Sequence, residues 1–136
     1  MNKQLFLKQM TGRGFELTSI NGQNPLKVGD IVTVRMELHA GRDYEYVHLK
    51  DMRAAGFEPV KTLSGHRYQD GLWFYESIRD ASTNFFITSL RKGTYVFEYE
   101  LRVTHAGEFS NGITTFRCMY APEFSAHSEG ERVKVQ

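Results

Sequence analysis

The chain lacks most of the features that would assign it to a specialised class of protein. It has a single cysteine among 136 residues, so no disulfide can form within it, and cysteine usage leaves its compartment open. No apolar run approaches the length of a membrane span. The first residues, Met1–Lys8, have no long apolar region and no cleavage site typical of a signal peptide, which leaves two hypotheses: a cytoplasmic protein, or a domain of a longer, exported chain. The formal net charge of +1, without a concentration of Lys and Arg, argues against nucleic-acid binding.

What the chain does have is an ordinary globular composition and a strong alternation of polarity. With 40% hydrophobic and 24% charged residues, it is expected to form one domain over residues 1–136, large enough to bury a core. The alternation is clearest from Gly93 to Thr104, where apolar and charged residues take turns. Because neighbouring side chains on a strand point to opposite faces, this run predicts a long strand with one buried face; the residues expected on that face are Tyr95, Phe97, Tyr99, Leu101 and Val103.

Similar runs, separated by glycine-rich turns, predict an all-β fold. We expect an antiparallel β-sandwich of immunoglobulin or fibronectin type, without an amphipathic helix beyond one possible turn near Arg53. The Asp70-Gly71 pair predicts a two-residue type I′ hairpin turn, because both residues readily adopt positive φ. About nine strands are expected, over residues 3–9, 31–38, 44–50, 67–69, 72–77, 84–89, 93–104, 113–121 and 132–135.

No residue pattern in the sequence predicts catalysis, a metal site or a cofactor. The five histidines have no metal-ligand spacing, and Cys118 is expected to be a small buried side chain. Asp51 and Glu58 could form an acid–base pair, but a turn-capping aspartate and a solvated glutamate explain them equally well. No phosphate-binding glycine loop or nucleophile elbow occurs, so we expect the chain not to be an enzyme.

Aromatic residues flank the predicted hairpin turn. At least one set of these rings is expected to face the core, since residues 73 and 75 lie on the opposite side of the strand from residue 74, and core packing is the favoured interpretation. The alternative is a ring platform, formed by Tyr68, Trp73 and Tyr75, that stacks on a carbohydrate or a protein partner in the manner of an adhesin-type module. A third possibility is an envelope structural domain without a ligand.

Several segments in order resemble one family, the bacterial alpha-2-macroglobulins. The resemblance is to their C-terminal macroglobulin-like domain, the equivalent of the receptor-binding domain of the animal proteins. It extends from about Leu26 to the end of the chain, and its most specific part is the sequence Met-Tyr-Ala-Pro-Glu. The segments are Tyr46–Asp51, Ala55–Pro59, Arg79–Phe86, Lys92–Phe109 and Met119–Glu123.

The resemblance implies a non-catalytic module of a large periplasmic or cell-envelope protease trap. In such a trap, cleavage of a bait region releases a reactive thioester, whose Cys-x-Glu-Gln motif belongs to another domain. Cys118 is followed by Met-Tyr-Ala, so it is not the thioester cysteine. The module would pack against the thioester domain and its neighbours in the parent chain, shield the thioester at rest, and meet target peptidases only through the parent.

The shielding role carries over best onto Met119 and Tyr120. Period two independently places Met119 on the opposite face from Phe116 and Cys118, so that its thioether points outward if those two residues face the core. We expect the rest of the domain interface to include Phe124 and the loop from Met52 to Phe57. Packing against the edge of the core is the alternative role for Met119.

Overall fold

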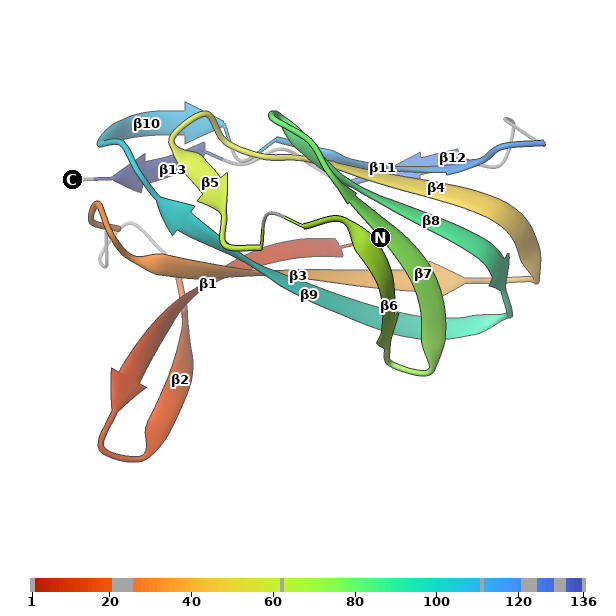
Figure 1. Cartoon of the computed structure of the whole chain (residues 1–136), viewed down its shortest axis with the longest axis horizontal. Helices are drawn as coiled ribbons and strands as arrows, with labels where there is room; N and C mark the ends of the chain where they lie inside the picture. Colours follow the sequence, from red (N-terminus) through yellow and green to blue (C-terminus); the bar gives the residue numbers. More distant parts are fainter. Residues whose placement is uncertain are drawn as a thin grey trace.

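The computed structural model describes residues 2–20, 26–61, 63–110, 112–120, 125–128 and 132–135. These ranges contain strands and turns only, so they include no helix long and apolar enough to cross a membrane. Figure 1 shows two layers of strands, one above the other. The strands are β1 (Asn2–Thr11), β2 (Gly14–Ser19), β3 (Ile31–Ala40), β4 (Tyr44–Met52), β5 (Phe57–Pro59), β6 (Gly65–Gln69), β7 (Leu72–Ile78), β8 (Ser82–Leu90), β9 (Gly93–Val103), β10 (Gly107–Ser110), β11 (Thr114–Cys118), β12 (Ser125–His127) and β13 (Arg132–Val135).

The two layers are antiparallel sheets, so the predicted β-sandwich is confirmed. One sheet has the order β2-β1-β3-β9-β5 and the other has the order β12-β11-β4-β8-β7-β6. Strands β10 and β13 form a separate antiparallel pair. The described residues form thirteen strands, four more than expected. The strands that the sequence pattern missed are β2, whose apolar side chains are largely exposed, and β5, β10 and β12, which are too short to show alternation.

The core lies between the sheets, as the alternation in β9 predicts. Phe97, Leu101 and Val103 are buried, and their charged neighbours on β9 point away from the core. The ring of Phe97 meets rings from the opposite sheet, with centroids 5.3 Å from Phe74 and 6.0 Å from Phe85. Offset and edge-on contacts of this kind stabilise an aromatic core beyond the area that it buries.

The connection near Arg53 is not helical. Instead, the backbone N–H of Phe57 donates to the carbonyl of Ala54 at 3.1 Å and closes a turn that leads directly into β5. Pairing of β5 with β9 therefore begins at Phe57, directly after this turn.

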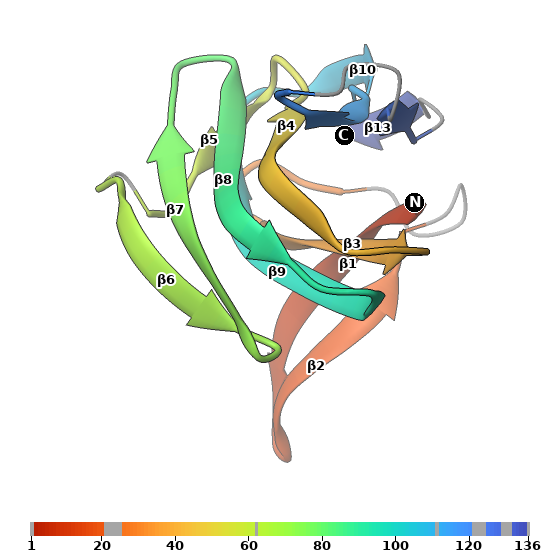
Figure 2. The same ribbon diagram turned by 90° about the vertical axis from the view of Figure 1, so that its right-hand side faces the viewer.

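The β6–β7 hairpin lies at one edge of the sandwich, next to β9. Its turn has positive φ at Asp70 (53°) and Gly71 (76°), as the type I′ prediction requires. Figure 1 shows the hairpin leaning across to β9, and Figure 2 shows β6 at the free edge of its sheet. The side chain of Gln69 bonds both backbone groups of Glu98, at 2.8 and 3.3 Å, and Asp70 Oδ2 accepts from the N–H of Val96 at 2.8 Å. The Gln69 and Asp70 side chains thus hydrogen-bond the backbone groups on the part of the β9 edge that does not pair with β5.

Candidate functional site

The surface at the carboxyl end of β11 contains the residues that the sequence favoured. Met119 is 53% exposed and Tyr120 is 80% exposed, whereas Phe116 and Cys118 are buried. The prediction that Met119 points away from the core is therefore confirmed. Together with Tyr46 of the neighbouring strand β4, Met119 and Tyr120 make up what we call the strand-end surface.

Strand β4 holds the strand-end surface in place. The N–H of Met119 donates to the carbonyl of Tyr46 at 2.9 Å, which continues the β4–β11 ladder beyond the Cys118–Val47 pair. Tyr46 has φ of 55°, a left-handed conformation that is uncommon for a residue with a side chain. Its ring stands edge-on to the ring of Tyr120, with centroids 5.1 Å apart at 89°. The sequence gives no signal for this backbone turn, so Tyr46 was not predicted as part of the site.

A shallow hollow of about 290 Å³ lies beside the strand-end surface. Cys118 lines it with its thiol, which donates to the carbonyl of Glu45 at 3.4 Å. Cys118 is buried, as predicted for a small side chain. Among the described residues, no three His, Cys, Asp or Glu side chains are grouped so that they could hold a metal ion.

Two of the other residues expected at the domain interface, Met52 and Phe57, lie away from the strand-end surface. Met52 is at the opposite end of β4, six residues from Tyr46 and about 20 Å along the strand. Phe57 is buried in the core, because β5 pairs with the end of β9 and places Phe57 opposite the buried Val103. This corrects the expectation that Phe57 is exposed at the interface. Phe124 lies outside the described residues. The structure therefore brings Met119 and Tyr120 together but leaves Met52 and Phe57 away from them.

A buried polar cluster around Asp51 joins the two sheets. The Asp51 carboxylate is fully buried on β4, with the Lys3 ammonium of β1 at 2.6 Å from Oδ1. Thr114 Oγ1 of β11 donates to Oδ1 at 2.8 Å, and the Tyr99 hydroxyl of β9 donates to Oδ2. Asp51 is thus neither a turn cap nor the partner of Glu58, which is exposed on β5. Since every oxygen of the carboxylate is held by a donor, the cluster is a structural joint between the sheets rather than an acid–base site.

A comparison with models of known protein families gives a match over most of the chain. The family model of the bacterial alpha-2-macroglobulin MG10 domain matches residues 2–123. The chain belongs to this family.

Individual relatives are much longer than this MG10 domain. Circularly permutated Ras protein 2 of Dictyostelium discoideum is 26% identical over 120 residues, which cover 88% of the chain and 3% of that protein. A mutant of Salmonella alpha-2-macroglobulin has a TM-score of 0.74 at 16% identity, over 99% of this chain and 9% of its own. Trypsin-activated alpha-2-macroglobulin from Escherichia coli has a TM-score of 0.74 at 15% identity, over 99% of this chain and 10% of its own. These two structures share the fold, and the chain spans only a small part of each relative.

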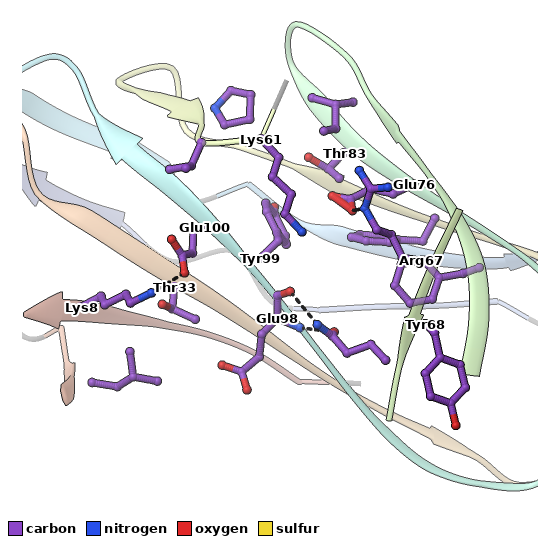
Figure 3. A pocket seen from close by; sticks show the side chains of 17 residues that line it. Lys8, Thr33, Lys61, Arg67, Tyr68, Glu76, Thr83, Glu98, Tyr99 and Glu100 are labelled. Carbon is purple, nitrogen blue, oxygen red and sulfur yellow. Dashed lines mark hydrogen bonds and ion pairs between the residues drawn. The ribbon is translucent and has the colours of Figure 1, made fainter. Parts of the chain in front are cut away.

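The MG10 domain has a larger cleft of about 460 Å³ at its open edge, between β6 and β9. Figure 3 shows its charged walls, with Lys8 beside Glu100 on one side and Arg67 beside Glu76 on the other. The two ion pairs have N–O distances of 2.6 and 3.4 Å, and the third carboxylate, Glu98, lies 3.5 Å from an Arg35 nitrogen. Each of the three carboxylates that line the cleft among the described residues therefore has a cationic neighbour.

The aromatic residues around the hairpin turn divide between core and surface. Phe74 is buried, so one set of rings faces the core as expected, but Trp73 is 70% exposed and Tyr68 is 58% exposed, so core packing was the wrong interpretation for these two rings. Tyr75 is also exposed, on the same outer face of the six-stranded sheet. The alternation along β7 explains the division, since only even-numbered side chains of this strand face the other sheet.

The buried phenol in the Asp51 cluster predicts a specific loss of stability at high pH. Burial raises the pKa of Tyr99 well above its ordinary value of 10.0, and the adjacent Asp51 charge raises it further. A raised pKa means that the group stabilises the fold fully below about pH 10, and that this contribution declines at higher pH as only the unfolded chain releases the proton. We expect the free energy of unfolding to fall there by up to about 1.4 kcal/mol per pH unit, measured by urea unfolding.

The variant Tyr99→Phe should remove this component of the alkaline slope, whereas the exposed control Tyr120→Phe should keep it. If the tyrosinate absorbance of Tyr99 developed together with that of the exposed tyrosines while the chain stayed folded, the assignment would fail.

Proposed function

We propose that this MG10 domain is a non-catalytic terminal module of a bacterial alpha-2-macroglobulin-like protease trap. It packs against the thioester domain of its own parent chain and shields the thioester from water in the resting state, as the receptor-binding domain of the animal proteins would. The parent is exported to the periplasm or cell envelope and meets target peptidases. The strand-end surface is the observation that carries the proposal: an outward thioether and two phenol rings at a fixed strand end.

The chemistry of these side chains suits a dry seal. A thioether adapts its shape to a partner and carries no charge, so it can cover a reactive carbonyl without bringing water to it. The tyrosine rings add apolar area, and their hydroxyls can stay at a wet rim. The polar side chains of Glu45 and Arg117 are exposed next to this surface, which gives it the apolar centre and polar border of a domain interface.

The anchoring of the surface supports the same role. Met119 is bonded through its backbone to β4, and the Tyr46–Tyr120 ring contact restrains the second ring. A seal that is already ordered loses little conformational entropy when it docks, so its contacts are available to exclude water.

The test is the rate of spontaneous thioester loss in the full-length parent. The double variant Met119→Gly and Tyr120→Gly is expected to raise hydrolysis and methylamine inactivation about tenfold, equivalent to about 1.4 kcal/mol of lost protection. The control Ile113→Ala changes an exposed apolar side chain that precedes the opposite end of β11 and should leave both rates unchanged. An unchanged rate in the double variant, with the domain still folded, would rule out the shielding role.

A second candidate function is a carbohydrate- or protein-binding module, in which the outer face of the six-stranded sheet meets a partner. Its support is the exposure of Tyr68, Trp73 and Tyr75. These rings lie on β6 and β7, whereas the strand-end surface lies at the ends of β4 and β11 in the same sheet, so the two functions use different residues and do not exclude each other.

A further inference from the structure

A hollow of about 410 Å³ lies in the gap where β7 and β8 separate, and it is lined both by outward-facing side chains of these strands and by Leu72, Phe74 and Tyr95 on the core side. The two strands are paired from Ile78–Thr83 as far as Tyr75–Phe86 and not beyond. Residues 72–74 and 87–89 therefore lack each other as strand partners, and the gap between them is the hollow. Its volume falls within the range of small-molecule sites. We call it the aromatic hollow; its lining residues include His66, Trp73, Tyr75, Phe86, Thr88 and Arg91.

The rings around the aromatic hollow are held in position by one another. Trp73 lies against Tyr68 with centroids 4.7 Å apart, and Tyr75 meets His66 edge-on at 5.1 Å. Phe86 stacks on His48 of β4 at 4.7 Å and 3°. A row of exposed rings thus crosses the sheet with its geometry fixed before any ligand arrives, which lowers the entropic cost of binding.

The polar groups of the hollow complement the rings. Thr88 and Ser89 supply hydroxyls, and the separated strands supply backbone groups that can bond a ligand. Of the described residues that line the hollow, none is acidic. Arg91 is exposed at the edge, and its guanidinium has no ion pair or side-chain hydrogen bond with any described residue. An exposed cation beside a concave apolar surface favours a ligand that has both an apolar face and a negative charge.

We propose that the aromatic hollow binds a saccharide that carries an acidic group. One pyranose ring stacks its apolar C–H face on Trp73, its hydroxyls bond the Thr88 and Ser89 side of the hollow, and a carboxylate or phosphate substituent pairs with Arg91. This inference specifies the ligand of the second candidate function and is independent of the thioester shield. Alternating apolar faces and hydroxyl edges are the chemistry that such a set of rings and polar groups recognises.

The sole tryptophan of the chain is part of the proposed site, so its fluorescence reports binding directly. The probes are a β-1,4-linked glucuronate tetramer and the neutral glucose tetramer of the same linkage, titrated into the chain in low-salt buffer. We expect both to change the Trp73 emission, with the acidic tetramer binding about tenfold more tightly. The same titration with a phosphorylated glucose tetramer distinguishes phosphate from carboxylate as the preferred acidic group.

Three variants test the roles of the residues. Arg91→Gln should abolish the preference for the acidic tetramer while neutral binding persists, and Arg91→Lys should restore part of it. Trp73→Ala should remove binding of both tetramers, measured by calorimetry because the variant has no tryptophan. The control Met10→Ala removes an exposed apolar side chain from the β1–β2 hairpin, which Figure 1 shows projecting from the rest of the domain, and should bind like the unmodified chain.

Three outcomes would overturn the proposal in different ways. Equal affinity for the two tetramers would reject the acidic ligand but keep a carbohydrate-binding module. Binding that Trp73→Ala leaves intact would place the saccharide elsewhere. If neither tetramer binds and the chain self-associates in sedimentation experiments unless Trp73 is replaced, the ring row is a protein interface.

Discussion

Replacing Asp51 by alanine is expected to lower the free energy of unfolding by about 3–5 kcal/mol. The variant leaves the Lys3 ammonium buried without its carboxylate and deprives Thr114 and Tyr99 of their acceptor. A buried charge that loses its partner costs far more than the pair contributes when intact, because the remaining ion keeps the full desolvation penalty. The effect should appear in urea unfolding as a lower midpoint at an unchanged m-value.

Two further variants separate this explanation from a general sensitivity of the domain. The exposed control Glu16→Ala on β2 should change stability by no more than about 0.5 kcal/mol. The double variant Lys3→Met and Asp51→Leu removes both charges and fills the space with apolar atoms, so it should recover most of the loss. A double variant as unstable as Asp51→Ala would show that the hydrogen bonds to Thr114 and Tyr99, rather than the ion pair, dominate.

The Asp51 cluster shows why the sequence predicted the two sheets but not the polar contacts that join them. Alternation is a local property, and it correctly assigned β9 its buried face from eleven consecutive residues. The Lys3–Asp51 pair depends on which strands stack across the core, and its members lie far apart in the chain. The sequence around Lys3 gave no indication that its side chain is buried.

The residues of the candidate site could likewise be predicted only in part from the sequence. Parity along β11 was enough to predict that Met119 points outward, because the strand is short and its buried residues are unambiguous. The inclusion of Met52 and Phe57 failed because sequence order does not reveal which end of an antiparallel strand meets a given surface. Tyr46 could not be predicted as part of the site, because its left-handed backbone conformation is uncommon for a residue with a side chain.

Replacing Gly112 by alanine is expected to destabilise the domain by at least about 3 kcal/mol. Gly112 has φ of +79°, a conformation that costs a residue with a side chain about 1–2 kcal/mol. A Cβ atom there would also lie 2.4 Å from the carbonyl oxygen of Met52 and 2.8 Å from its carbonyl carbon. These are backbone atoms of β4, so they cannot rotate out of the way as a flexible side chain would, and the strand itself must shift.

The matched control for this prediction is Gly41→Ala, because Gly41 has ordinary φ and no heavy atom lies within 4 Å of the place that the alanine methyl group would take. That variant should stay within about 0.5 kcal/mol of the unmodified chain. Since Gly112 enters β11 from the end opposite to Met119, a shift of β4 at Met52 also disturbs the ladder that carries the strand-end surface. Equal midpoints for the two alanine variants would mean that β4 and the start of β11 do not approach as closely as the structure requires, and the fixed position of Met119 and Tyr120 would lose its support.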